Sequence, residues 1–477
     1  MSSKNNSLNR RGFIKASAAS SVAAGISVSP FAAFGATATA TTNYRSPNEQ
    51  VGLGFIGTGI RFYGLVDRAT EYGPGVALAD ADMLQAGRGL QKLRDRHMNQ
   101  KYPLTIGAFE DYRRVLDNKD VNIVVVASPD HWHTRHVIDS MRAGKDVYCE
   151  KPLTLTIAEG SLIEKVQKET GRVIQIGTQQ RTEMDGKFAQ AAAMVRDGRV
   201  GDLDLVTICL GGSRTCDPLP KVDPPKNLNW DLWLGQAPMT AYRESKEYGH
   251  TSGWGAGHKF SRTHRYYRWF YEYSGGKLTD WGAHHVDIAM LAVDKLRDDI
   301  GNIEINPIEV AHPMDFEKGM PTKDDQFNCA TKFKVELKFA DGLTMHVRDE
   351  APDKGLTNGI MFEGKEGRFV VNRGKIVGKP VEQLKEKPLP EDSMEKLYGQ
   401  PMPKNHMDNF MECVQSRKTP ISDLQSHYCM LNVCPAINIA LRLNRKLTYD
   451  PKARKFVGDD LANSFVAREQ RKGYELS

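Results

Sequence analysis

With 477 residues, the chain is longer than one typical hydrophobic core supports, so two domains are expected. A hydrophobic fraction of 40% and a charged fraction of 26% are ordinary for a soluble globular protein. The formal net charge is +6, of which the four basic residues before position 16 supply four, so the rest of the chain is close to neutral and a nucleic-acid-binding role is not indicated. The seven cysteines are scattered without a Cys-x-x-Cys pair, which argues against a disulfide framework or a structural zinc.

The first 40 residues are interpreted as a targeting segment. The stretch 9–15, Asn-Arg-Arg-Gly-Phe-Ile-Lys, precedes a weakly apolar run that is too rich in Ser, Thr and Gly to span a membrane. This pattern resembles a twin-arginine export signal, and a disordered basic tail is the alternative. We therefore expect a periplasmic or otherwise exported protein, with no stable membrane span after the signal is removed at Ala36, Ala38 or Ala40.

The next segment reads as a nucleotide-binding loop. Residues 51–56 form an apolar strand pattern, and the segment 57–62 after it opens a helical pattern that runs through Leu65 and Ala69. Gly57 and Gly59 lie between them, where glycine lets the backbone turn sharply and approach a pyrophosphate at the helix N-terminus. Phe62 stands where a third glycine is usual, so the helix is expected to pack differently there.

An acidic residue follows the second strand pattern, residues 76–79. Asp80 lies 23 residues after Gly57, where a carboxylate can bond both ribose hydroxyls of an adenosine. Such a carboxylate repels a 2′-phosphate, so Asp80 favours NAD over NADP. An ordinary cap at the end of a strand is the alternative interpretation.

Strand and helix patterns continue to alternate through residue 177. Residues 121–127 are apolar except for Asn122, as expected of a parallel strand buried on both faces. Ser-Pro-Asp-His-Trp-His at 128–133 follows, then a helix pattern, another strand and Cys-Glu-Lys-Pro at 149–152. This order predicts a Rossmann domain over 50–175, with a doubly wound parallel sheet.

These motifs resemble the glucose-fructose oxidoreductase/inositol dehydrogenase (Gfo/Idh/MocA) family. The resemblance rests on the two-glycine loop, Asp80, the segments 128–133 and 143–145, and Glu-Lys-Pro at 150–152. It implies that Lys151 lies beside the nicotinamide and the substrate hydroxyl, with Glu150 holding it. The candidate cofactor-binding residues are Gly57, Gly59, Ile60, Arg61, Asp80, Ser128, Pro129, His133, Glu150 and Lys151.

The second half of the chain reads as a substrate-binding domain over 176–405. Its strand patterns, with few helices between them, predict a C-terminal open, largely antiparallel β-sheet, one face of which can cover the nicotinamide. The strand patterns lie at 204–209, 330–339, 342–348 and 359–371. Residues 406–450 are expected to form helices that, as the resemblance implies, return to the Rossmann domain.

A long insertion at 211–276 is rich in aromatic and basic residues, and loops of this length inside a domain are usually functional. Arg268, Trp269 and Tyr271 are candidates for a sugar-binding wall. A surface packed against a partner subunit is the alternative.

A second motif begins at Gly275-Gly276. If the segment from Leu278 is helical, Asp280 and His284 share one face, and the resemblance implies that both complete a catalytic site with Lys151. His285 is a further substrate candidate, with a packed core histidine as the alternative. No metal is expected, because adjacent histidines point about 100° apart on a helix.

Together these features predict an NAD-dependent oxidoreductase that acts on a hydroxyl of a sugar, glycoside or polyol, with a tightly held cofactor. His284 is the expected base, Asp280 orients it or a neighbouring hydroxyl, and Lys151 binds the reacting oxygen. One alternative is a redox-neutral, NAD-dependent glycoside hydrolase that works by oxidation, elimination and re-reduction. A non-catalytic sugar-binding protein is the other. A homo-oligomer is expected.

Overall fold

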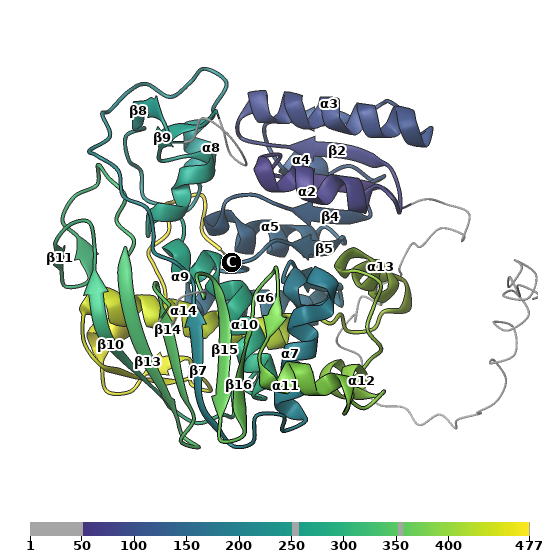
Figure 1. Ribbon diagram of the computed structural model, residues 1–477. Helices are drawn as coiled ribbons and strands as arrows, with labels where there is room; N and C mark the ends of the chain where they lie inside the picture. Colours follow the sequence, from purple (N-terminus) through teal and green to yellow (C-terminus); the bar gives the residue numbers. More distant parts are fainter. Residues whose placement is uncertain (1–50, 250–256, 352–355, 477) are drawn as a thin grey trace, which may run out of the picture. The chain divides into compact units, whose positions relative to one another are not determined.

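The computed structural model describes residues 51–249, 257–351 and 356–476 (Figure 1). The expected export signal, residues 1–40, lies outside the described residues. None of the described helices has the length and apolar character needed to cross a membrane.

The first described sheet is six-stranded and parallel throughout, with the order β3-β2-β1-β4-β5-β6. The predicted Rossmann fold is therefore confirmed. Its strands are β1 (Leu53–Ile56), β2 (Gly75–Ala79), β3 (Gly107–Phe109), β4 (Ile123–Val126), β5 (Asp146–Cys149) and β6 (Ile174–Ile176). The connecting helices are α2 (Ile60–Ala69), α3 (Met83–Gln100), α4 (Arg113–Leu116), α5 (Asp130–Arg142) and α6 (Ile157–Thr170).

Alternation along these strands builds two hydrophobic layers. Phe55 and Val125 pack in one layer with α2, α3 and a later helix, α13 (His406–Ser416). Ile56 and Val126 point to the other side, where α5 and α6 cover the sheet. Burial on both faces explains why β1 and β4 are apolar throughout.

The second described sheet has nine strands in the order β17-β16-β15-β7-β14-β13-β10-β18-β19. Its pairs are antiparallel except β7 with β14, so the predicted open, mostly antiparallel sheet is confirmed. The strands are β7 (Leu203–Cys209), β10 (Ile303–Ala311), β13 (Lys332–Phe339), β14 (Thr344–Arg348), β15 (Gly359–Gly364), β16 (Gly367–Val371), β17 (Ile376–Val377), β18 (Leu447–Asp450) and β19 (Lys455–Phe456).

Two details of this sheet differ from the sequence expectation. The run 359–371 is a hairpin, β15 and β16, rather than one strand. Strand β10 was not expected, because Pro307 interrupts its pattern and proline cannot donate to a ladder. The strand accommodates Pro307 with a register shift before Glu309 and pairs with β13 and β18.

Helices cover one face of the second sheet. α7 (Lys187–Arg196), α10 (Gly282–Ala292) and α14 (Leu424–Leu443) share its core, and every residue of α10 is buried. The other short described helices are α8 (Trp230–Leu234), α9 (Gly276–Asp280), α11 (Lys379–Glu382), α12 (Ser393–Tyr398) and α15 (Asp460–Asn463). The short strands are β8 (Glu244–Tyr248), β9 (Lys259–Ser261), β11 (Phe316–Glu317) and β12 (Met320–Pro321).

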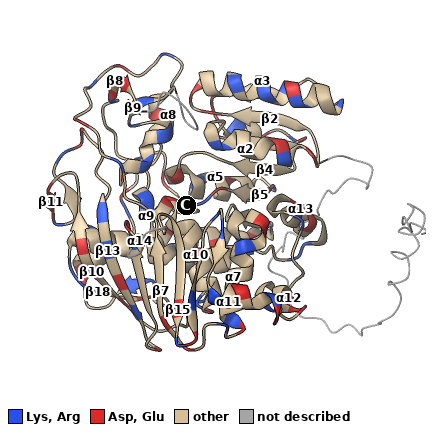
Figure 2. Cartoon of the chain, viewed as in Figure 1, with Lys and Arg blue, Asp and Glu red and all other residues tan. Residues whose placement is uncertain are grey.

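The C-terminal segment after β19 returns to the Rossmann domain beside α5 (Figure 1). Tyr474 packs edge-to-face on Trp132 at 6.0 Å between ring centroids and donates a hydrogen bond to Asp231. Acidic and basic residues both occur along surface helix α3, where basic residues predominate (Figure 2).

A buried ion pair joins α10 to the segment after β6. Arg181 is 1% exposed and Asp287 is 0% exposed, and Arg181 Nε donates to Asp287 Oδ2 at 2.8 Å. Asp287→Ala leaves the guanidinium buried without its counter-ion, so we expect a loss of about 3–5 kcal/mol in the free energy of unfolding. Denaturant titration measures it. Asp202→Ala, which removes the exposed partner of Lys365, is the control and should cost less than about 1 kcal/mol; equal losses would contradict this account.

Candidate active site

A cavity of about 870 Å³ lies at the carboxyl ends of β1, β2, β4 and β5. In a doubly wound sheet this edge is where ligands bind. From the second domain, helices and loops line the cavity, including α9, the start of α10 and the turn His264–Trp269. The expectation that a face of the second sheet covers the site is therefore wrong: no described cavity-lining residue belongs to its strands, whose inner face is covered by α7, α10 and α14.

The end of the cavity at α2 suits a pyrophosphate. Gly57 has φ +85°, and a Cβ there would lie 2.5 Å from the backbone nitrogen of Ser128, so only glycine fits. Gly59 is the N-cap of α2, and a Cβ on it would meet nothing within 4 Å. No side chain caps this helix end, which leaves backbone N–H groups at Ile60 and Arg61 beside open space.

Phe62 explains how the helix packs without a third glycine. The ring is 1% exposed and meets Phe55 of β1 edge-to-face, with centroids 5.3 Å apart. An aromatic pair thus fixes the helix against the strand where glycine would allow close backbone contact.

Asp80 lies at the end of β2 and lines the cavity. Its carboxylate accepts hydrogen bonds from the backbone nitrogens of Thr58 at 2.8 Å and Asp82 at 2.9 Å, so it also caps the loop, as the alternative interpretation held. Burial raises the pKa of Asp80, and the two N–H donors oppose that shift. Asp82 in turn accepts from His264 Nε2 at 2.8 Å, which ties the second domain to this loop.

The Ser-Pro-Asp-x-x-His segment shapes the floor of the cavity. Ser128 Oγ bonds His136 Nδ1 at 2.9 Å, and Pro129 is the N-cap of α5. His133 lines the cavity, but its ring nitrogens contact the carbonyl oxygens of Pro152 at 2.6 Å and Ser128 at 2.9 Å. His133 therefore positions two loops rather than presenting a free polar atom.

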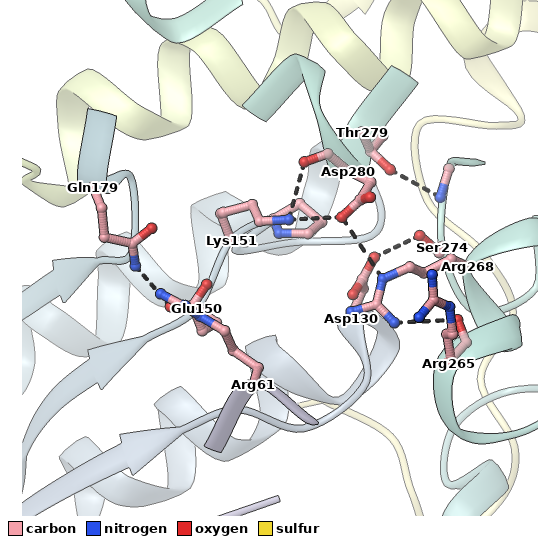
Figure 3. A network of polar contacts seen from close by, with 12 residues as sticks. Arg61, Asp130, Glu150, Lys151, Gln179, Arg265, Arg268, Ser274, Thr279 and Asp280 are labelled. Carbon is pink, nitrogen blue, oxygen red and sulfur yellow. Dashed lines mark hydrogen bonds and ion pairs between the residues drawn. The ribbon is translucent and has the colours of Figure 1, made fainter. Parts of the chain in front are cut away.

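Glu150 does not hold Lys151 directly, contrary to the expectation. Its carboxylate forms an ion pair with Arg61 Nε at 2.8 Å and accepts from Gln179 Nε2 at 2.8 Å (Figure 3). It thereby links the start of α2 to the segment after β6, one residue before Lys151.

Lys151 is held by Asp280 instead. Its Nζ lies 2.7 Å from Asp280 Oδ1 and 3.0 Å from the Asp280 carbonyl oxygen (Figure 3). Burial opposes ionisation of Asp280, but Lys151 and then Arg268 outweigh it and hold the pKa of this carboxyl well below its usual range. The two residues are a charged pair at the meeting of the two domains.

His284 lines the cavity and is 5% exposed. Burial lowers the pKa of its imidazole well below the usual value, and the positive charges of Lys151 and Arg373 lower it further. Its Nδ1 has no hydrogen-bond partner among the described residues. Burial and the two positive charges therefore favour the neutral imidazole, which is the form that can accept a proton.

Two glycines place the Asp-His segment. A Cβ at Gly275 would come within 2.3 Å of Thr279, and Gly276 has φ +66° with Cys329 only 2.7 Å from an added Cβ. α9 ends at Asp280 and α10 begins at Gly282, so the expected single helix is broken at Trp281.

Of the four substrate candidates, two line the cavity. Arg268 stacks over Tyr267 at 4.7 Å, with its Nε 3.7 Å from Asp280 Oδ1, and Trp269 is a second lining residue. Tyr271 and His285 are not among the described lining residues, so their predicted substrate contacts are not supported.

Both of these side chains have structural roles. The Tyr271 hydroxyl accepts from the Ala330 backbone nitrogen at 3.2 Å, under the guanidinium of Arg442. His285 is fully buried, with Nε2 2.8 Å from Asn358 Oδ1, and is the packed core histidine of the alternative interpretation.

The sequence interpretation assigned no role to several lining residues. Asp130, inside the quoted motif, accepts from Ser274 Oγ at 2.5 Å and Tyr267 Oη at 3.0 Å, joining the two domains. Arg373 lies in a loop after β16, and its guanidinium carbon is 4.5 Å from the centroid of the Trp281 ring. Asp130 could have been found from its motif, whereas Arg373 stands in no pattern.

A Rossmann sheet, a second open sheet and a cavity lined by segments of both domains define a two-domain, nucleotide-binding class of protein. Family models agree. Residues 77–178 match "Oxidoreductase family, NAD-binding Rossmann fold", and residues 214–476, more than half of the chain, match "Oxidoreductase family, C-terminal alpha/beta domain". The chain belongs to the Gfo/Idh/MocA family, and its first domain is an NAD-binding Rossmann domain.

Similarity to characterised relatives is partial. The chain is 29% identical to inositol 2-dehydrogenase of Salmonella typhimurium over 152 residues, which is 32% of this chain and 41% of that protein. It is 32% identical to an alpha-N-acetylgalactosaminidase of Shewanella oneidensis over 117 residues, 23% of this chain and 24% of that protein. The matches therefore span less than half of these relatives.

The fold is also that of solved structures. The WlbA dehydrogenase from Bordetella pertussis, in complex with NADH and UDP-GlcNAcA, superposes with a TM-score of 0.53 at 16% identity. The match covers 83% of this chain and 98% of that one. It supports the two-domain fold.

Proposed function

We propose that the protein is an NAD-dependent oxidoreductase that oxidises or reduces a hydroxyl-bearing carbon of a sugar, glycoside or polyol. The observation that carries the proposal is the ion pair between Lys151 and Asp280 beside the neutral imidazole of His284, in one cavity with the uncapped N-terminus of α2. Family membership supports the reaction class. The polyol and sugar names of the relatives support the substrate class.

The cavity residues fit the cofactor. The N–H groups at the start of α2 would bind the pyrophosphate, Asp80 the adenosine ribose, and Lys151 would lie near the nicotinamide. When bound, NAD supplies the hydride acceptor for the substrate carbon.

The protein supplies the proton chemistry. A hydroxyl must lose its proton as its carbon becomes a carbonyl, so a base must reach the oxygen. His284 takes this proton because its imidazole is neutral. Lys151 donates a hydrogen bond to the same oxygen and stabilises its developing negative charge, and Asp280 fixes the Lys151 ammonium in place.

The cofactor preference follows from Asp80. Because its carboxylate lies in the cavity, we expect Asp80→Ala to weaken NAD binding about ten-fold and to narrow the preference for NAD over NADP. Fluorescence titration with both nucleotides measures this. Asp95→Ala, an exposed carboxylate on α3, is the control. An unchanged ratio of the two affinities would show that Asp80 acts only as a loop cap.

A redox-neutral glycoside hydrolase is the second candidate, favoured by the similarity to an alpha-N-acetylgalactosaminidase. The same three residues would serve, with oxidation, elimination of the aglycone and return of the hydride. Purified protein incubated with NAD and a panel of glycosides separates the two. Accumulation of NADH with a keto sugar supports the oxidoreductase; aglycone release without net cofactor change supports the hydrolase. A protein that binds sugars but does neither is a non-catalytic binder.

Export is part of the proposal. The paired arginines at 10–11 support the twin-arginine route, which carries folded proteins, so NAD would travel already bound and would have to be tightly held. The export route is tested by replacing both arginines with lysine and fractionating cells that express the variant. Loss of the periplasmic form is expected; unchanged export would contradict it.

We also propose a homo-oligomer, with the face of the nine-stranded sheet opposite α7, α10 and α14 as the contact. Along β13, buried and less buried residues alternate, so this face bears the exposed side chains. Light scattering that gives a monomer at working concentration would contradict the proposal.

A further inference from the structure

Four cationic side chains line one stretch of the cavity wall around Asp280. Lys277 lies in α9, Arg265 and Arg268 lie in the turn His264–Trp269, and Arg214 follows β7. Arg265 and Arg268 lie on the far side of Asp280 from Glu150 and Arg61 (Figure 3). Three separate segments therefore bring positive charge to the substrate side of the Lys151–Asp280 pair.

Two carboxylates act on this stretch. Asp280 lies 2.7 Å from Lys151 and 3.7 Å from Arg268, and the charge of Asp130 also acts on Arg268. Glu150, farther along the cavity wall, pairs with Arg61. Lys151 and the four cations of this stretch outnumber the two carboxylates, so the wall around Asp280 has a surplus of positive charge.

The surplus acts on Lys277. Burial lowers the pKa of its ammonium, and although Asp280 opposes this, Arg214, Lys151 and Arg265 lower it further. Two contacts fix the position of Lys277. Its backbone nitrogen donates a hydrogen bond to Ser213 Oγ at 3.1 Å, and its Nζ lies 5.3 Å from the Trp281 ring centroid. A half-buried cation among like charges is unfavourable unless an anion joins it.

We propose that the carbohydrate substrate carries an anionic substituent, a carboxylate or a sulfate ester, which binds Lys277, Arg268 and Arg214 while the reacting hydroxyl lies at Lys151 and His284. This proposal rests on the proposed function. Guanidinium groups bind planar and tetrahedral oxyanions through paired N–H donors, and lysine adds a point charge. The cofactor's own phosphates have a separate place at the N-terminus of α2.

Matched pairs of acidic and neutral sugars test the proposal. The NAD-loaded full-length protein is titrated by calorimetry with D-glucuronate and D-glucose, D-galacturonate and D-galactose, and N-acetylgalactosamine with and without a 6-sulfate. In at least one pair the acidic member should bind at least about ten-fold more tightly. The pair that shows the preference distinguishes carboxylate from sulfate.

Variants of Lys277 connect the preference to the site. Lys277→Met should reduce the preference to within about two-fold without changing NAD affinity, and Lys277→Arg should retain most of it. Lys332→Met, which removes an exposed lysine of β13, is the matched control and should leave the preference unchanged. Three results would overturn the proposal. They are equal binding of the neutral and acidic members in every pair, no binding in any pair, and a preference that survives Lys277→Met.

Its failure is distinct from failure of the proposed function. If only neutral sugars reduce NAD, the acidic-substrate proposal is wrong and the proposed oxidoreductase function stands. If acidic sugars bind in a Lys277-dependent way but no assay detects hydride transfer, the anion site stands and the proposed oxidoreductase function is wrong.

Discussion

Lys151→Ala is expected to lower kcat by roughly 10²- to 10⁴-fold, while NAD affinity changes by less than about three-fold. The Lys151 ammonium lies 2.7 Å from Asp280 Oδ1, and an alanine side chain has no donor to replace its hydrogen bond to the reacting oxygen. The effect should fall on kcat rather than KM, because the bond to the oxygen strengthens as charge develops. Steady-state kinetics on the best substrate measures it.

Lys168→Ala is the matched control, since it removes a lysine from the surface pair with Glu164 on α6. It should leave kcat and KM unchanged. Turnover by Lys151→Ala within a few-fold of the wild type, with NAD still bound, would show that the assigned role is wrong.

His284→Asn is the second large effect, with an expected loss of roughly 10²- to 10⁴-fold in kcat. Asparagine keeps polarity and approximate size but cannot accept a proton at neutral pH. His346→Asn, a partly exposed histidine of β14 beside Glu336, is the control and should retain activity. Equal activity of the two variants would remove His284 from the mechanism.

The pH dependence of kcat tests the role of His284 independently. A histidine ordinarily becomes protonated near pH 6.5 and would then lose its function as a base. Burial, Lys151 and Arg373 lower the pKa of His284, so the base stays neutral as pH falls through this value. We expect kcat to stay level between about pH 8 and 6 and to fall only below that range. A loss of activity centred near pH 6.5 would contradict the assignment.

Much of the fold could be predicted from local signals. Continuous apolar strands and the Gly57 loop identify a parallel sheet, because burial on both faces and a tight turn each demand particular residues. β10 could not be found this way, since Pro307 is accommodated through a register shift in the pairing with β13, a strand distant in sequence. The domain interface depends equally on partners distant in sequence, such as Asp130 and Ser274.

The candidate site was partly predictable for the same reason. Lys151, Asp280 and His284 stand in spaced motifs, and the structure brings all three to one cavity. Within the aromatic insertion, however, composition does not say which rings face the cavity, and Tyr271 packs under Arg442 instead. Likewise the partner of Lys151 is Asp280 rather than its neighbour Glu150, which only three-dimensional packing decides.

The central claim is that a substrate hydride reaches NAD in this cavity with the help of Lys151. Isotope transfer tests it most directly. Wild-type and Lys151→Ala proteins loaded with NAD are incubated with carbohydrates deuterated at carbon, and the nucleotide released on denaturation is examined by mass spectrometry. Within the time of one wild-type turnover, we predict deuterium on the nicotinamide from the wild type and at least about 10²-fold less from Lys151→Ala. Deuterium from neither protein with any carbohydrate, or equal amounts from both, would contradict the account.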